Sequence, residues 1–66
     1  MEEQIATLIK HYAVDFLVKQ ASKNSIKLYN QKENFYINIS KEEHATNKKL
    51  HYNEIALVME IQKRFL

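Results

Sequence analysis

A chain of 66 residues makes one domain, residues 1–66, and ten basic against eight acidic residues leave a net charge of only +2. The absence of glycine excludes the Walker A loop, the dinucleotide-binding fingerprint and the EF-hand loop, which all need glycine where backbone turns sharply or approaches a phosphate. The absence of cysteine excludes disulfides and thiolate metal sites, and it predicts a reducing, cytoplasmic setting.

The first predicted element is a long helix over residues 2–22. Apolar residues recur at helical spacing along it and form one broad stripe: Ile5, Leu8, Ile9, Tyr12, Ala13, Phe16 and Leu17. Val14, Val18 and Ala21 lie beyond this stripe and widen the apolar surface. Either the rest of the chain covers these three residues, or they meet a second copy of the protein in a homodimer.

Residues 25–40 are predicted to form a β-hairpin, around which the chain is organised. Apolar and polar residues alternate on both arms, so five apolar side chains share one face: Ile26, Leu28, Phe35, Ile37 and Ile39. The predicted register sets Leu28 opposite Ile37, Ile26 opposite Ile39 and Tyr29 opposite Tyr36, with residues 31–34 as the connection. A slip of one residue would turn every apolar side chain to water, so this register is strongly specified.

Asparagine is expected to make the turns in place of glycine, because it tolerates left-handed backbone better than most residues. The six asparagines are Asn24, Asn30, Asn34, Asn38, Asn47 and Asn53. After the hairpin, Ser40 and Glu43 form a capping-box pattern that predicts a short helical turn over residues 41–46, followed by a basic loop over residues 47–50.

A second helix is predicted from Tyr52 or Asn53 to about Phe65, with Asn53 as a candidate N-cap. Its expected inner face consists of Tyr52, Ile55, Val58, Met59, Phe65 and Leu66, with Leu57 and Ile61 at one edge. The predicted fold is therefore α+β: helix, hairpin, short turn and helix (αββα), with two amphipathic helices packed on a two-stranded antiparallel hairpin.

The ionisable residues do not form a recognisable catalytic or metal-binding motif. His11 and Asp15 stand four apart on the predicted first helix, an arrangement that fits a solvated surface pair better than a base and its orienting partner. His44 and His51, with Glu42 or Glu43, match no compact zinc spacing. We expect no catalytic residue, no metal and no cofactor, so the protein is not expected to be an enzyme.

No stretch of the sequence suits a membrane. The longest unbroken apolar run is Ile55–Met59, far short of the roughly 20 residues that a span needs. The first residues, Met1–Glu3, are acidic where a secretory signal would be basic. The sequence predicts a protein that neither enters nor crosses a membrane.

The leading functional hypothesis is a non-catalytic protein-binding module, a small regulator or inhibitor of a larger protein machine. An isolated hairpin has two unpaired edges, so a partner chain or a homodimer is expected to complete it. The predicted interface residues are Val14, Val18, Ala21, Tyr29 and Tyr36. In size and composition the chain resembles the short accessory proteins of phages and mobile elements in Gram-positive bacteria.

The alternative is a nucleic-acid-binding regulator. Tyr29 and Tyr36 on the outer face of the hairpin offer rings on which bases stack. The expected phosphate contacts are Lys27, Lys41, Lys48 and Lys49. Salt dependence separates the two hypotheses, because phosphate contacts make affinity fall steeply with salt and a hydrophobic interface does not.

Overall fold

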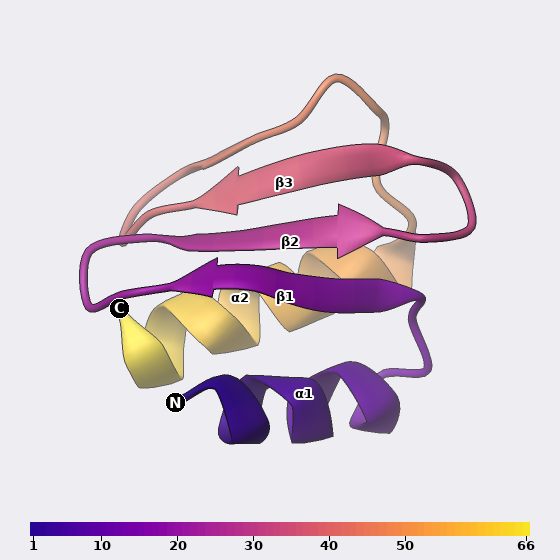
Figure 1. The fold of residues 1–66 in the computed structure, drawn as a ribbon. Helices are drawn as coiled ribbons and strands as arrows, with labels where there is room; N and C mark the ends of the chain where they lie inside the picture. The colour runs from indigo at the N-terminus through magenta and orange to yellow at the C-terminus, as the bar shows by residue number, and fades with distance from the viewer.

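The computed structural model describes residues 1–66 and contains two helices and a four-stranded antiparallel sheet (Figure 1). In chain order the elements are α1 (Glu2–His11), β1 (Phe16–Ala21), β2 (Ile26–Asn30), β3 (Phe35–Ile39), β4 (His44–Ala45) and α2 (Tyr52–Phe65). The strands keep their sequence order in the sheet. The predicted α+β class is confirmed, but the arrangement is αββββα and not αββα.

Helix α1 ends at His11, so the predicted helix over residues 2–22 is wrong beyond that point. Ala13 adopts left-handed backbone (φ 56°), its amide donates to the carbonyl of Lys10, and the amide of Val14 donates to the carbonyl of Ile9. This hydrogen-bond pattern is a Schellman motif, in which glycine usually occupies the left-handed position. Alanine in that position gives no sequence signal for a helix end.

Strand β1 occupies the segment that was predicted as the second half of the helix. It pairs with β2, with Phe16 opposite Asn30 and Val18 opposite Leu28, and the register then shifts between Val18 and Gln20. This shift is a β-bulge, which leaves Lys19 as an extra residue on β1. The sheet therefore gains an edge strand that the sequence did not predict.

The predicted hairpin is confirmed in its strands, its register and its connection. Strands β2 and β3 pair with Ile26 opposite Ile39, Leu28 opposite Ile37 and Tyr29 opposite Tyr36. In the connecting turn, Asn34 adopts left-handed backbone (φ 58°) and its amide donates to the carbonyl of Asn30. Asn34 is the one asparagine that takes the role expected of glycine, because no other asparagine has a positive φ.

The predicted helical turn over residues 41–46 is wrong. The amide and the hydroxyl of Ser40 both donate to the carbonyl of Glu43, which closes a tight turn instead of opening a helix. The chain then pairs with β3 as the short strand β4, with Ala45 opposite Asn38. Gln62 of α2 donates to the carbonyls of Ser40 and Glu43 and fixes this turn to the helix.

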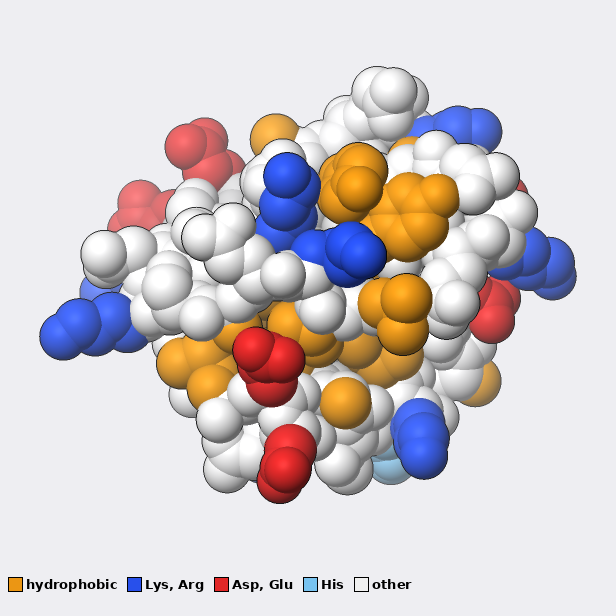
Figure 2. Space-filling view, in the orientation of Figure 1, with side chains coloured by type: hydrophobic (Ala, Val, Ile, Leu, Met, Phe, Trp, Pro, Cys, Tyr) orange, Lys and Arg blue, Asp and Glu red, His pale blue; other side chains and the backbone are white.

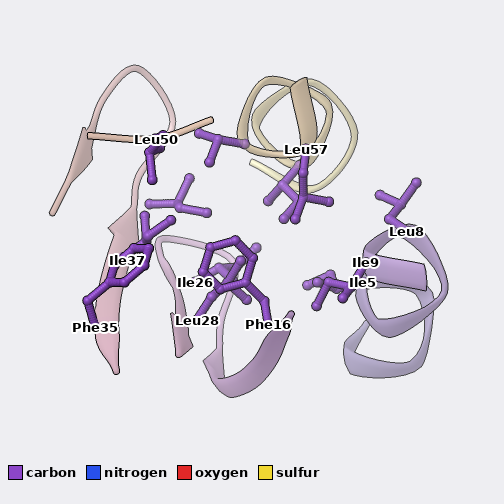
Figure 3. Close-up of a cluster of buried hydrophobic side chains, with 13 residues drawn as sticks. Ile5, Leu8, Ile9, Phe16, Ile26, Leu28, Phe35, Ile37, Leu50 and Leu57 are labelled. Carbon is purple, nitrogen blue, oxygen red and sulfur yellow. The ribbon is translucent and has the colours of Figure 1, made fainter. Parts of the chain in front are cut away.

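One apolar core joins the inner face of the sheet to both helices (Figure 3). Helix α2 lies across this face, and α1 lies beside β1 (Figures 1 and 3). The buried apolar residues are Ile5, Leu8, Ile9, Phe16, Ile26, Leu28, Phe35, Ile37, Ile39, Leu50, Leu57, Val58 and Ile61. Neither helix has the length and the apolar content that crossing a membrane requires.

Helix α2 begins and ends as predicted, but its predicted inner face is wrong in part. Leu57 and Ile61, expected at the edge, are fully buried at its centre together with Val58. Tyr52, Ile55 and Met59, expected inside, are exposed to solvent. The N-cap is His51 and not Asn53.

Candidate functional site

The structure separates the predicted interface residues into two groups. Val14 follows α1, while Val18 and Ala21 lie on β1, so the three do not form a strip along one helix. All three are half-buried and pack against the core. Tyr29 and Tyr36 lie on the other side of the sheet, where no helix covers them.

The outer face of the sheet carries two rows of side chains across the strands. One row places Leu17 next to Tyr29 and Tyr29 next to Tyr36. The neighbouring row consists of Gln20, Lys27, Asn38 and Ala45. The two tyrosine rings contact each other with their centroids 4.8 Å apart, and the hydroxyl of Tyr29 donates to Oδ1 of Asn34 over 2.6 Å. The rings are therefore held in place by the sheet and by the turn.

Two lysines flank the tyrosines. Nζ of Lys27 lies 4.8 Å from the ring centroid of Tyr36, and Nζ of Lys19 lies 5.9 Å from that of Tyr29. Both distances fit cation–π contacts, each worth roughly 0.5–1 kcal/mol on an exposed surface. Lys19 is the extra residue of the bulge, so the bulge adds a second positive charge to this face. We call Leu17, Lys19, Lys27, Tyr29 and Tyr36 the tyrosine face.

No acidic residue lies on any strand of the sheet. The eight acidic residues are all in helices, turns and connections: Glu2, Glu3, Asp15, Glu33, Glu42, Glu43, Glu54 and Glu60. Figure 2 shows this face toward the viewer, with lysines beside the exposed apolar side chains and acidic side chains at its margin. The tyrosine face therefore combines aromatic rings with charge of one sign.

The other predicted basic contacts lie outside the tyrosine face. Lys41 is in the turn after β3, and Lys48 and Lys49 are in the segment between β4 and α2. All three are exposed and none forms a salt bridge. The structure brings Lys27 to the two tyrosines, while the other three predicted lysines remain on connections.

A second exposed surface lies on the side of α2 that faces away from the sheet. Tyr52, Ile55 and Met59 are 84%, 41% and 63% exposed, and their spacing of three and four residues aligns them along the helix. We call these three residues the α2 stripe. They are half of the six large apolar side chains that the protein exposes, the others being Met1, Leu17 and Tyr36.

A cleft of about 330 Å³ lies where the connection between α1 and β1, the turn over residues 31–34 and the start of α2 meet. At its base, Asn30 and Glu54 are only 3% and 4% exposed, and Nδ2 of Asn30 donates to Oε2 of Glu54 over 3.2 Å. Oδ1 of Asn30 accepts from the amides of Lys32 and Glu33, and Oε1 of Glu54 accepts from the amide of His51. Every hydrogen-bonding atom of this pair has a partner within the protein, so the pair organises the fold and offers no free group to a ligand.

The histidines are distributed over separate elements. His11 ends α1 and Asp15 lies in the following connection, so the predicted pairing of the two on one helix is wrong. His44 lies on β4 and His51 caps α2. Nowhere do three side chains of His, Asp or Glu gather in an arrangement suited to a metal ion.

No protein-family model matches the sequence, and neither a curated protein nor a solved structure is significantly similar to it.

Two parts of the exposed surfaces were not predicted from the sequence. The position of Lys19 beside a tyrosine was not predicted, because the spacing of the apolar residues around Lys19 predicted a helix. The residues of the α2 stripe were predicted to lie in the core.

Proposed function

We propose that the protein is a non-catalytic protein-binding module that inserts the α2 stripe into an apolar groove of a larger protein and regulates or inhibits it. The observation that carries this proposal is the exposure of Tyr52, Ile55 and Met59 along one side of a helix. Anchors at positions i, i+3 and i+7 are the pattern by which an amphipathic helix binds in a groove. Aromatic anchors also contribute strongly to binding energy when a pocket encloses them.

The small size of the stripe supports a groove as its complement. A standard interface between two proteins involves about 20–30 residues on each side. Three side chains on a convex helix cannot build such an interface against a flat surface, but a groove that surrounds the helix also contacts its flanks. The partner is therefore expected to be concave and larger than this chain.

The charges beside the stripe indicate the chemistry of the groove's rim. Lys48 and Lys49 precede α2 and Lys63 lies in its last turn, and none of the three forms a salt bridge. The half-buried acid of the helix, Glu60, forms a salt bridge with Arg64, with 3.7 Å between Oε2 of Glu60 and Nε of Arg64, so its charge is offset. A partner with an acidic rim complements this distribution, which favours rapid and specific association.

Photocrosslinking tests the proposal in cells that naturally carry the protein. A photoreactive residue at position 59 lies on the stripe, and one at position 38 is a matched control, because Asn38 is exposed on the outer face of the sheet. We expect position 59 to crosslink a defined larger protein and position 38 not to do so. Crosslinking of the same protein from position 38 alone would contradict the proposal.

Binding to the purified crosslinked protein then gives the energetic test. Met59→Glu places a charge in the centre of the stripe and is expected to weaken binding by at least about 2 kcal/mol. Leu17→Glu is the control, since Leu17 is an exposed apolar residue on the tyrosine face. Equal affinities of the Met59→Glu variant and the wild type would exclude the α2 stripe as the interface.

A further inference from the structure

We infer that the tyrosine face is a second, independent binding surface, which binds single-stranded nucleic acid through base stacking and phosphate contacts. It lies on the outer face of the sheet, whereas the α2 stripe points away from the inner face, so the two surfaces are on opposite sides of the molecule. The inference therefore does not depend on the proposed protein partner.

Tyr29 and Tyr36 supply the aromatic surface for base stacking. Every base presents a flat π surface, and stacking of bases on aromatic side chains binds single strands with little sequence preference. Tyr36 is 45% exposed and Tyr29 is half-buried beside it, with the two residues directly opposite each other across neighbouring strands. The ring pair forms a platform whose position is fixed by the register of β2 and β3.

Lys19 and Lys27 supply the positive charge for phosphate contacts. Each ammonium group lies over a tyrosine ring, with its Nζ within 6 Å of the ring centroid. A base that stacks on that ring displaces the ammonium group from the ring face, and the flexible lysine side chain then contacts the phosphate of the same nucleotide. No strand carries an acidic residue that would repel the phosphates or pair with the lysines. The positive charge of the two lysines complements a polyanion, while the rings complement its bases.

A double helix does not suit this surface. Its bases are stacked on each other and are not available to the tyrosines, so a duplex would retain the phosphate contacts alone. A single strand can present both groups to the same face. We therefore expect the protein to prefer a single strand to the duplex that contains it.

Fluorescence anisotropy with a labelled oligothymidine of about twelve nucleotides measures this binding directly. The affinity is expected to fall with salt, with a slope of log K against log salt near −1.4 for two phosphate contacts at about −0.7 each. Tyr36→Leu retains the apolar side chain and loses the ring, and it is expected to weaken binding at least about fivefold. Lys27→Gln is expected to reduce the magnitude of the slope by about 0.7.

Matched controls come from the opposite side of the molecule. Tyr52→Leu and Lys63→Gln alter an exposed tyrosine and an exposed lysine of α2, and both variants are expected to bind the oligonucleotide as the wild type does. Met59→Glu, which disrupts the proposed protein interface, is also expected to leave this binding unchanged. Oligonucleotide binding therefore tests the tyrosine face alone, and binding to the crosslinked protein tests the α2 stripe alone.

Tyrosine fluorescence provides a readout that does not rely on variants within the surface. The protein has no tryptophan and four tyrosines, so a variant with Tyr12→Phe and Tyr52→Phe emits only from Tyr29 and Tyr36. Stacking of bases on these rings is expected to quench the emission with the same midpoint as the anisotropy change. Binding without quenching would place the nucleic acid elsewhere on the protein.

Three further results would overturn the inference. The first is no binding of the oligonucleotide at low salt. The second is equal binding by the wild type and a folded Tyr36→Leu variant, which would reduce the interaction to charge alone. The third is loss of binding in a variant with Lys48→Gln and Lys49→Gln but not in one with Lys19→Gln and Lys27→Gln, which would assign the contact to the connection before α2.

Discussion

Ala13 adopts a strained, left-handed backbone conformation directly after the end of α1. An L-residue with a side chain pays roughly 1–2 kcal/mol for left-handed backbone, and glycine does not. Ala13→Gly should relieve this strain, but it also makes the unfolded chain more flexible, which costs about 0.4–1 kcal/mol of stability. The expected net result is an increase of about 0.5–1 kcal/mol in the free energy of unfolding. Urea unfolding followed by circular dichroism measures this difference.

Ala6→Gly is the matched control for this prediction. Ala6 is exposed in the interior of α1, where glycine costs about 1 kcal/mol relative to alanine. The two substitutions are thus expected to change stability in opposite directions. A loss of stability in both variants would contradict the left-handed geometry at Ala13.

Individual residues also explain which turns could be predicted. Asn34 lies between two alternating arms, so both its position and its residue type indicated a turn, and the structure confirms it. Ala13 lies within a run of helix-forming and apolar residues, and its type favours helix. A left-handed alanine is determined by the packing around it, which the local sequence does not encode.

At the scale of elements, the bulge explains why β1 has the sequence pattern of a helix. A regular strand turns every second residue inward, but the extra residue Lys19 separates the inward positions Val18 and Ala21 by three. Together with Val14, these residues have the spacing i, i+4 and i+7, which is also that of a helix face. The hairpin lacks a bulge, so its period of two remained intact and its register was predictable.

Helix α2 shows a second limit of periodicity. Apolar residues occur on two sides of it, with Leu57, Val58 and Ile61 on one and the α2 stripe on the other. Both sets have helical spacing, so the pattern located the helix but could not decide which side faces the sheet. In the structure, Leu57, Val58 and Ile61 are buried and the α2 stripe is exposed. The helical spacing of both sets did not predict which of the two would be buried.

The hairpin gives the sharpest prediction at this scale. Ile37 is fully buried opposite Leu28, so Ile37→Lys would bury a charge without a partner and is expected to unfold the domain, whose total stability is of the order of 5 kcal/mol. Asn38→Lys, on the exposed face, is expected to change stability by less than about 0.5 kcal/mol. Thermal unfolding of both variants tests the facing of β3, and similar melting temperatures would contradict it.

At the scale of the whole molecule, one face of the sheet is covered by helices and the other is open. The homodimer expected from the sequence remains a proposal, but the structure changes the surface that it can use. Val14, Val18 and Ala21 are half-buried against the core, whereas the α2 stripe is free. We therefore propose the α2 stripe, and not Val14, Val18 and Ala21, as the contact of such a homodimer.

Sedimentation equilibrium tests this assignment. Because three side chains fall short of a standard interface, association of the wild type is expected to be weak and to appear only at high micromolar concentration. Met59→Glu should abolish it, and Leu17→Glu should not. A wild type that remains monomeric throughout this range would exclude the homodimer and leave the stripe to a different protein.

The hydrogen bond between Asn30 and Glu54 has a consequence for the position of α2 along the sheet. Apolar side chains alone would tolerate a helix displaced by one turn, about 5.4 Å, because another set of similar residues would then meet the core. Such a displacement would separate the amide of Asn30 from the carboxylate of Glu54 and leave buried polar groups without a partner, at a cost of several kcal/mol. One polar contact between residues 24 positions apart in sequence thus excludes the slipped packings that the apolar core would accept, and it fixes the position of the α2 stripe relative to the tyrosine face.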